Sequence, residues 1–99
     1  MAVQTLPAEA GLGHTASRTL LKASGGAVVA FSFGAGGGLD EHATPHEALA
    51  VVTEGALDVT LEGETQTVRA GEAVQLPARA PHAVRAPGGA RMLLVLLRP

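Results

Sequence analysis

Residues 41–55 read EHATPHEALAVVTEG, and residues 70–84 read AGEAVQLPARAPHAV. Each stretch combines histidine, His42 and His46 in the first and His82 in the second, with a short apolar run that ends at proline or at a Glu-Gly pair. Short apolar runs bounded by such turn-forming residues are typical of buried β-strands. The two stretches therefore predict β-structure, with histidines beside short strands.

The chain on either side of these stretches has the same β character. Residues 28–33 are rich in β-branched and aromatic side chains between glycines, and residues 57–62 alternate between apolar and polar. Gly63 offers a hairpin turn, and further short strands are predicted at residues 65–70, 82–85 and 91–97. Seven to nine closely spaced strands without a helix predict an all-β sandwich or barrel.

The length of 99 residues predicts a single domain. Residues 1–16 show no sustained period, and we interpret them as an N-terminal arm, with the domain covering residues 17–99. The three glycines at 36–38 predict a flexible loop inside that domain.

Composition excludes several classes of partner. The net charge is −2, basic residues are scattered, and Trp and Tyr are absent, which argues against nucleic acid as a partner. The most apolar stretch, Met92–Leu97, is too short to cross a bilayer as a helix, so no membrane partner is expected. The absence of cysteine and of a signal-like N-terminus favours a cytoplasmic protein.

The unbroken apolarity of Met92–Leu97 predicts a strand that is covered on both faces. One face belongs to the domain core. The other face has two candidate covers, which are the partner subunit of a homodimer and the arm at residues 1–16. The sequence leaves both open.

Taken together and in this order, the stretches at 41–55 and 70–84 resemble the two motifs of the cupins, and the resemblance extends over about residues 28–97. The first cupin motif has two histidines, a carboxylate or amide and a glycine; the second has a Gly-Asp/Glu turn, an apolar strand into proline, and a Pro-His pair. The resemblance implies a small single-domain cupin, which is a double-stranded β-helix or jelly-roll barrel and usually a dimer. In metal-bearing cupins the motif ligands meet inside the barrel on one divalent ion.

Matching the motifs residue by residue shows where this chain departs from the family pattern. His42 and His82 match ligand positions of the first and second motif. Thr44 stands where the second histidine belongs, and Ala48 stands where the carboxylate or amide belongs, with Glu47 one residue early. The resemblance thus implies a pocket at His42, Thr44, Ala48 and His82 that retains two of four usual ligands.

Two imidazoles are too few for a typical catalytic metal site, which has three protein ligands and a water. His46 is the candidate third ligand, and Asp40 and Glu47 are alternatives. The alternative for His46 and Glu47 is a structural role as solvated turn residues, and Asp40 can equally be a loop residue beside the glycines. The cofactor therefore stays open between one divalent transition metal (Zn, Fe, Mn or Ni) and none.

These observations favour a protein that binds a small molecule in an aliphatic barrel pocket, with His42 and His82 as polar anchors. A metal-dependent enzyme of isomerase or dioxygenase type, with His42, His82 and a non-standard third ligand, is the first alternative. The second is a structural or regulatory dimer module with a vestigial pocket. Whether the protein is an enzyme is left open.

Overall fold

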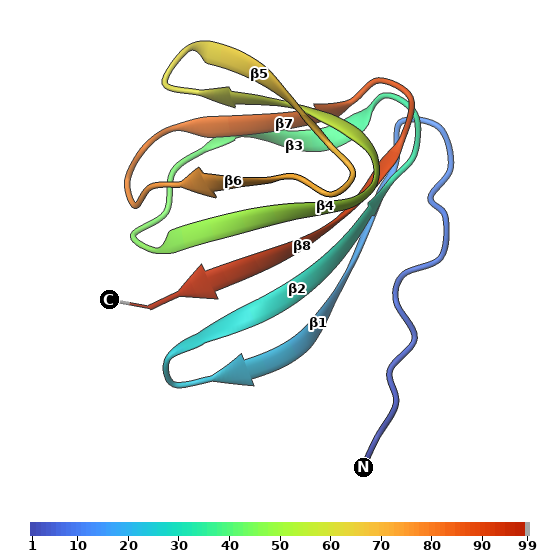
Figure 1. Cartoon of the computed structure of the whole chain (residues 1–99), viewed down its shortest axis with the longest axis vertical. Coiled ribbons are helices and arrows are strands. Elements are labelled where there is room, and N and C mark those ends of the chain that lie inside the picture. The colour runs from blue at the N-terminus through green and yellow to red at the C-terminus, as the bar shows by residue number, and fades with distance from the viewer. Residues whose placement is uncertain (99) are drawn as a thin grey trace.

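A computed structural model describes residues 1–98 and shows an all-β protein of eight antiparallel strands (Figure 1). In chain order the strands are β1 (Thr15–Ala23), β2 (Gly26–Phe33), β3 (Gly37–His42), β4 (Glu47–Leu61), β5 (Glu64–Arg69), β6 (Ala73–Leu76), β7 (His82–Ala86) and β8 (Ala90–Leu97). No helix within residues 1–98 is long and apolar enough to cross a membrane.

The strands form a sheet in the order β1-β2-β8-β4-β7-β3 that curls on itself, as Figure 1 shows. β4 joins the two halves of this curled sheet. Its first part pairs with β8 and β6, and its second part pairs with β5 and β7. One long strand thus belongs to both layers, and each of the two motif-bearing stretches contributes strands to both.

The expectation that the apolar run ending at Glu54-Gly55 and the alternating segment at 57–62 are separate strands is wrong, because β4 runs unbroken from Glu47 to Leu61. A register shift between Val52 and Glu54 bends the strand, and Gly55 follows with φ 74°. A Cβ at Gly55 would also collide with the carbonyl oxygen of Gly89. Glycine therefore lets the chain change direction there without ending the strand.

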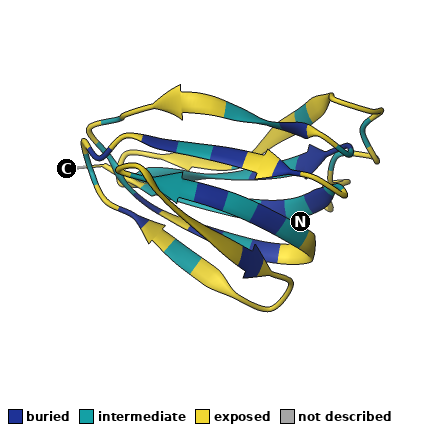
Figure 2. Cartoon of the chain, turned by 90° about the horizontal axis from the view of Figure 1, so that it is seen from above, coloured by how far each residue is buried: buried dark blue, intermediate teal, exposed yellow. Residues whose placement is uncertain are grey.

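The hydrophobic core lies between the two layers and follows the two-residue period of the strands. Figure 2 shows buried and more exposed residues alternating along several strands. The core draws on both parts of β4 and on the strands that face it. Its largest fully buried apolar side chains are Leu57, Met92, Val52 and Val84.

The N-terminal arm is tied to the barrel at several points. The Gln4 side chain donates to the Leu20 carbonyl at 2.7 Å, Arg18 donates to the Thr5 carbonyl at 3.2 Å, and the Gly13 amide donates to the Ala35 carbonyl at 2.8 Å. β1 begins at residue 15, two residues before the predicted start of the domain.

The outer face of β8 is covered at one end only. Leu6 and Pro7 of the arm line a small cavity together with Ala30 and Leu93, and Ala30 is only 2% exposed although it alternates with core-facing residues. The arm therefore provides the second cover at this end. Farther along β8, Leu97 is exposed. A partner subunit as the cover for this uncovered part of the outer face of β8 stays a proposal.

The prediction of a flexible loop at 36–38 is wrong for two of its three glycines. Gly36 is in a turn with φ 81°, but Gly37 and Gly38 begin β3 and pair with Ala86 and Arg85 of β7. A Cβ at Gly38 would collide with the carbonyl oxygen of Val84. These glycines allow two strands to approach each other closely. Composition alone cannot distinguish this role from that of a flexible loop.

Candidate functional site

His42 and His82 lie side by side at one end of the barrel. His42 ends β3, His82 begins β7, and the two residues are partners in the antiparallel ladder. Their ring centroids are 4.4 Å apart, with the ring planes at 63° in an edge-on arrangement. Strand pairing thus brings together two histidines that have 39 residues between them. The motif positions alone do not establish this contact.

Both rings are oriented by the backbone in the same way. Nδ1 of His42 lies 2.8 Å from the carbonyl oxygen of Asp40, and Nδ1 of His82 lies 3.0 Å from that of Ala80. A carbonyl can only accept a hydrogen bond, so each Nδ1 carries the hydrogen. In the neutral ring, Nε2 then retains its lone pair and is available to a ligand.

The two histidines differ in burial. His82 is 7% exposed, whereas His42 is exposed. His82 also has Leu61 of β4 as its partner on the other side of β7. The pair therefore consists of one inner and one outer imidazole at the mouth of the barrel.

Asp40 does not join the histidines as a third ligand. The ladder between β3 and β7 is irregular between Leu39 and His42, so Asp40 and His42 do not share a regular two-residue alternation. The Asp40 side chain is 93% exposed and forms an ion pair with Arg85 at 2.7 Å. Asp40, which the sequence offers as an alternative third ligand, is therefore directed to solvent and to Arg85.

Thr44 and His46 form the turn between β3 and β4. The Thr44 hydroxyl accepts from the His46 amide and donates to the His46 carbonyl, both at 3.3 Å. The Thr44 carbonyl accepts from the Arg79 amide at 2.7 Å, which ties this turn to the loop before β7. His46 is half-buried, and its Nδ1 is buried without a hydrogen-bond partner among residues 1–98.

Glu47 turns away from the core and binds the β6 side of the same loop. Its carboxylate accepts from the Gln75 side chain at 2.9 Å and from the Ala78 amide at 2.5 Å. The Ala78 hydrogen bond first, then the Gln75 hydrogen bond and the charge of Arg79, lower the pKa of Glu47, against a smaller opposing effect of burial. Ala48, by contrast, is 6% exposed and belongs to the core.

These residues do not make up a standard metal centre. Over residues 1–98, no three His, Asp or Glu side chains gather into a set that could hold a metal ion. The structure brings His42 and His82 together and does not add His46 or Glu47 to them as such a set. The chain therefore offers two nitrogen ligands where a catalytic metal site typically has three protein ligands.

Two cavities lie near the strands of this arrangement, and neither is lined by His42 or His82. A cavity of about 110 Å³ between β5 and β6 is lined by Val59, Leu61, Glu64, Gln66 and Val74, and Leu61 is the ladder partner of His82. A larger cavity, of about 440 Å³, lies at the other end of the barrel. The sequence does not indicate this second cavity, because its walls come from segments that only the strand register and the arm bring together.

Comparison with known proteins agrees with the geometry. Residues 29–97 match the family model of the cupin domain. The chain belongs to the cupin family. The all-β jelly-roll barrel expected from the two motifs is thereby confirmed, and no curated protein matches this cupin.

Solved structures include close likenesses of this cupin. SPY1581, a conserved protein of unknown function from Streptococcus pyogenes, is 31% identical, with a TM-score of 0.83 over 88% of this chain and 76% of that one. A cupin 2 conserved barrel domain protein from Leptotrichia buccalis is 33% identical, with a TM-score of 0.86 over 92% of this chain and 44% of that one. A cupin from Desulfitobacterium hafniense covers both chains completely with a TM-score of 0.88, and at 20% identity it shows the fold alone.

Proposed function

We propose that this cupin binds a small molecule at the mouth of the barrel, with His42 and His82 as its polar anchors. The observation that carries the proposal is the shared orientation of the rings, in which each Nδ1 is bonded to a backbone carbonyl. The Nε2 atom of each of these two adjacent rings is thereby left as an acceptor. The two acceptors suit a ligand with two hydrogen-bond donors, such as a pair of hydroxyl groups.

The apolar surroundings and the space beside His82 limit the size of this ligand. Val59, Leu61 and Val74 contribute aliphatic surface to the adjacent cavity, and Glu64 and Gln66 contribute polar groups. Ligand sites are commonly apolar, with a few convergent polar groups. His42 and His82 do not line this cavity themselves, and its volume of about 110 Å³, below that of pockets for drug-sized molecules, supports a small polyol or hydroxy acid as the ligand that reaches from the histidines toward Leu61.

Protection of histidines from acylation tests this proposal. The full chain is treated with diethyl pyrocarbonate in the presence of a panel of three- to six-carbon polyols and hydroxy acids, and modified residues are located by mass spectrometry. We expect at least one compound to protect His42 and His82 saturably, and to leave the exposed His14 of the arm reactive. His82→Ala should abolish binding of that compound. If no compound protects either histidine, the proposal fails.

A metal-dependent enzyme of isomerase or dioxygenase type is the second candidate. The observation in its favour is that histidines bound to metals commonly have one ring nitrogen hydrogen-bonded to a carbonyl or carboxylate, which is how His42 and His82 are held. The missing third ligand would have to be water or the substrate. Elemental analysis separates the candidates: stoichiometric Zn, Fe, Mn or Ni that is lost in His82→Ala favours the enzyme, and metal-free protein favours the binder.

A further inference from the structure

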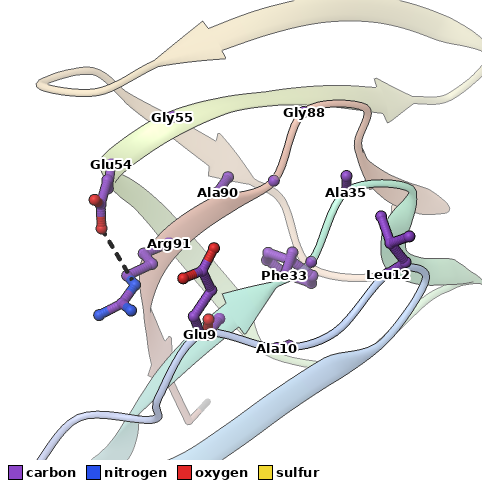
Figure 3. A pocket seen from close by; sticks show the side chains of 13 residues that line it. Glu9, Ala10, Leu12, Phe33, Ala35, Glu54, Gly55, Gly88, Ala90 and Arg91 are labelled. Atoms are coloured by element: carbon purple, nitrogen blue, oxygen red, sulfur yellow. Dashed lines mark ion pairs between the residues drawn. The ribbon is translucent and has the colours of Figure 1, made fainter.

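The larger cavity lies at the end of the barrel opposite the histidines, between the N-terminal arm and the sheet (Figure 3). Its volume of about 440 Å³ falls within the range of small-molecule sites. Its walls are Glu9, Ala10 and Leu12 of the arm, the end of β2, the bend in the middle of β4, the start of β8, and the turns that follow β2 and precede β8. None of these segments takes part in the site at the other end.

The wall formed by the arm is held at both ends. Arg18 donates to the Thr5 carbonyl before it, and the Gly13 amide donates to the Ala35 carbonyl after it. Residues 6–12 therefore span the cavity as a strap between two fixed points. This strap keeps Glu9 and Leu12 beside the cavity.

The charges of the side chains that line the cavity do not sum to zero. Ser32, Arg91 and Glu54 are ladder partners on β2, β8 and β4, and Nε of Arg91 lies 3.2 Å from a Glu54 carboxylate oxygen. Glu9 extends from the arm into the cavity, as Figure 3 shows, and it forms no ion pair within residues 1–98. With Arg91 already paired, Glu9 leaves the cavity with a net charge of −1.

The rest of the lining is apolar or small. Phe33 and Ala90 belong to the core, and Leu12 of the arm is 82% exposed, which is unusual for a leucine and leaves its side chain available at the cavity. Glycines of the turns expose backbone rather than side chains. One carboxylate above an apolar surface is complementary to a cation that carries a short hydrocarbon group.

We propose that this cavity binds a small organic cation, specifically a primary amine with a short apolar chain. The ammonium group donates to the Glu9 carboxylate, and the hydrocarbon chain packs against Leu12. The site is separate from the proposed histidine site, because the two occupy opposite ends of β3 and β7.

An NMR titration of the full-length protein with n-butylammonium chloride tests the proposal, with sodium butyrate as the matched anion. We expect saturable shifts at millimolar concentrations for amides of residues 9–12, 34–35 and 88–91, and no such shifts with butyrate. Glu9→Gln should weaken butylammonium binding about tenfold, because a charge-assisted hydrogen bond is lost. Glu62→Gln, which removes an exposed carboxylate from the β4–β5 turn, should leave the affinity unchanged.

Glu9 is exposed on the arm, so Glu9→Gln should fold as the wild type does. The proposal is overturned if butyrate binds as well as butylammonium, since Arg91 would then govern the cavity. It is also overturned if Glu9→Gln binds butylammonium with unchanged affinity, or if the amides around the cavity show no saturable shift.

Discussion

Glu47 is the residue that connects the two loops beside the histidines. Its carboxylate accepts from Gln75 at the end of β6 and from the Ala78 amide in the loop that leads to His82. The Thr44 carbonyl accepts from the Arg79 amide in the same loop. The Glu47 carboxylate is thus held by two hydrogen bonds to the segment that leads to His82, which stabilise the conformation of that loop.

This arrangement predicts a specific pH dependence of stability. The pKa of Glu47 in the folded protein lies below its ordinary value of 4.5, because the Ala78 amide and the Gln75 side chain stabilise the carboxylate. A lowered folded pKa means that the contribution to stability is complete above about pH 4.5 and is lost as the pH falls through the folded pKa. Glu47→Gln should therefore be less stable than the wild type near neutral pH, and this difference should narrow below about pH 4.5.

Urea unfolding of both proteins from about pH 7 down to about pH 2 measures this difference. Glu41→Gln, which removes an exposed carboxylate from β3, controls for the loss of one negative charge. A stability gap between wild type and Glu47→Gln that stays constant over this pH range would contradict the assigned role.

At the scale of elements, β3 shows what the sequence could and could not predict. The barrel and the placement of His82 at the start of β7 followed from apolar runs and motif spacing, because both are local signals. The position of Asp40 depended on a β-bulge, and the pairing of Gly38 depended on how closely β7 approaches. Both are properties of the contact between two strands, and neither strand encodes them alone.

The close contact at Gly38 predicts that an alanine there destabilises the protein, whereas an alanine at Gly88 does not. Gly38→Ala should destabilise the protein by about 1–3 kcal/mol, because the added Cβ meets the Val84 carbonyl and the Arg85 side chain. Gly88→Ala is the matched control, since a Cβ there has no heavy atom within 4 Å, and its effect should stay within about 0.5 kcal/mol. Denaturation midpoints measure both changes, and equal midpoints for the two variants would show that Gly38 is not at a tight contact.

Considered as a whole molecule, the barrel has an apolar outer face that the arm leaves uncovered. Leu21, Val28, Val95 and Leu49 are successive ladder partners across β1, β2, β8 and β4. Leu21 is 61% exposed and Leu49 is 41% exposed, and Leu97 at the end of β8 is 56% exposed. We define these five residues as the outer apolar face. A contiguous apolar surface of this kind is typical of an interface.

We propose that a second copy of the chain covers the outer apolar face and forms a homodimer. Four of its residues align across four strands, so the same face on two copies can pack sheet against sheet around a twofold axis. Sedimentation equilibrium should show a dimer for the wild type. Leu49→Glu should sediment as a monomer, because dimerisation would bury an unpaired carboxylate. Leu12→Glu, which makes the same change at an exposed leucine on the arm, should remain dimeric.

A wild type that sediments as a monomer at every concentration, or a Leu49→Glu variant that dimerises normally, would exclude this face as the interface. The result also bears on the third interpretation of the molecule, a structural or regulatory dimer module with a vestigial pocket. That interpretation requires dimers that persist in His42→Ala and His82→Ala with every other property of the wild type retained. If the dimer forms and the histidine variants lose ligand protection, the pocket and the interface are separate functions of one barrel, since the outer apolar face and the histidine pair lie on different layers of the curled sheet.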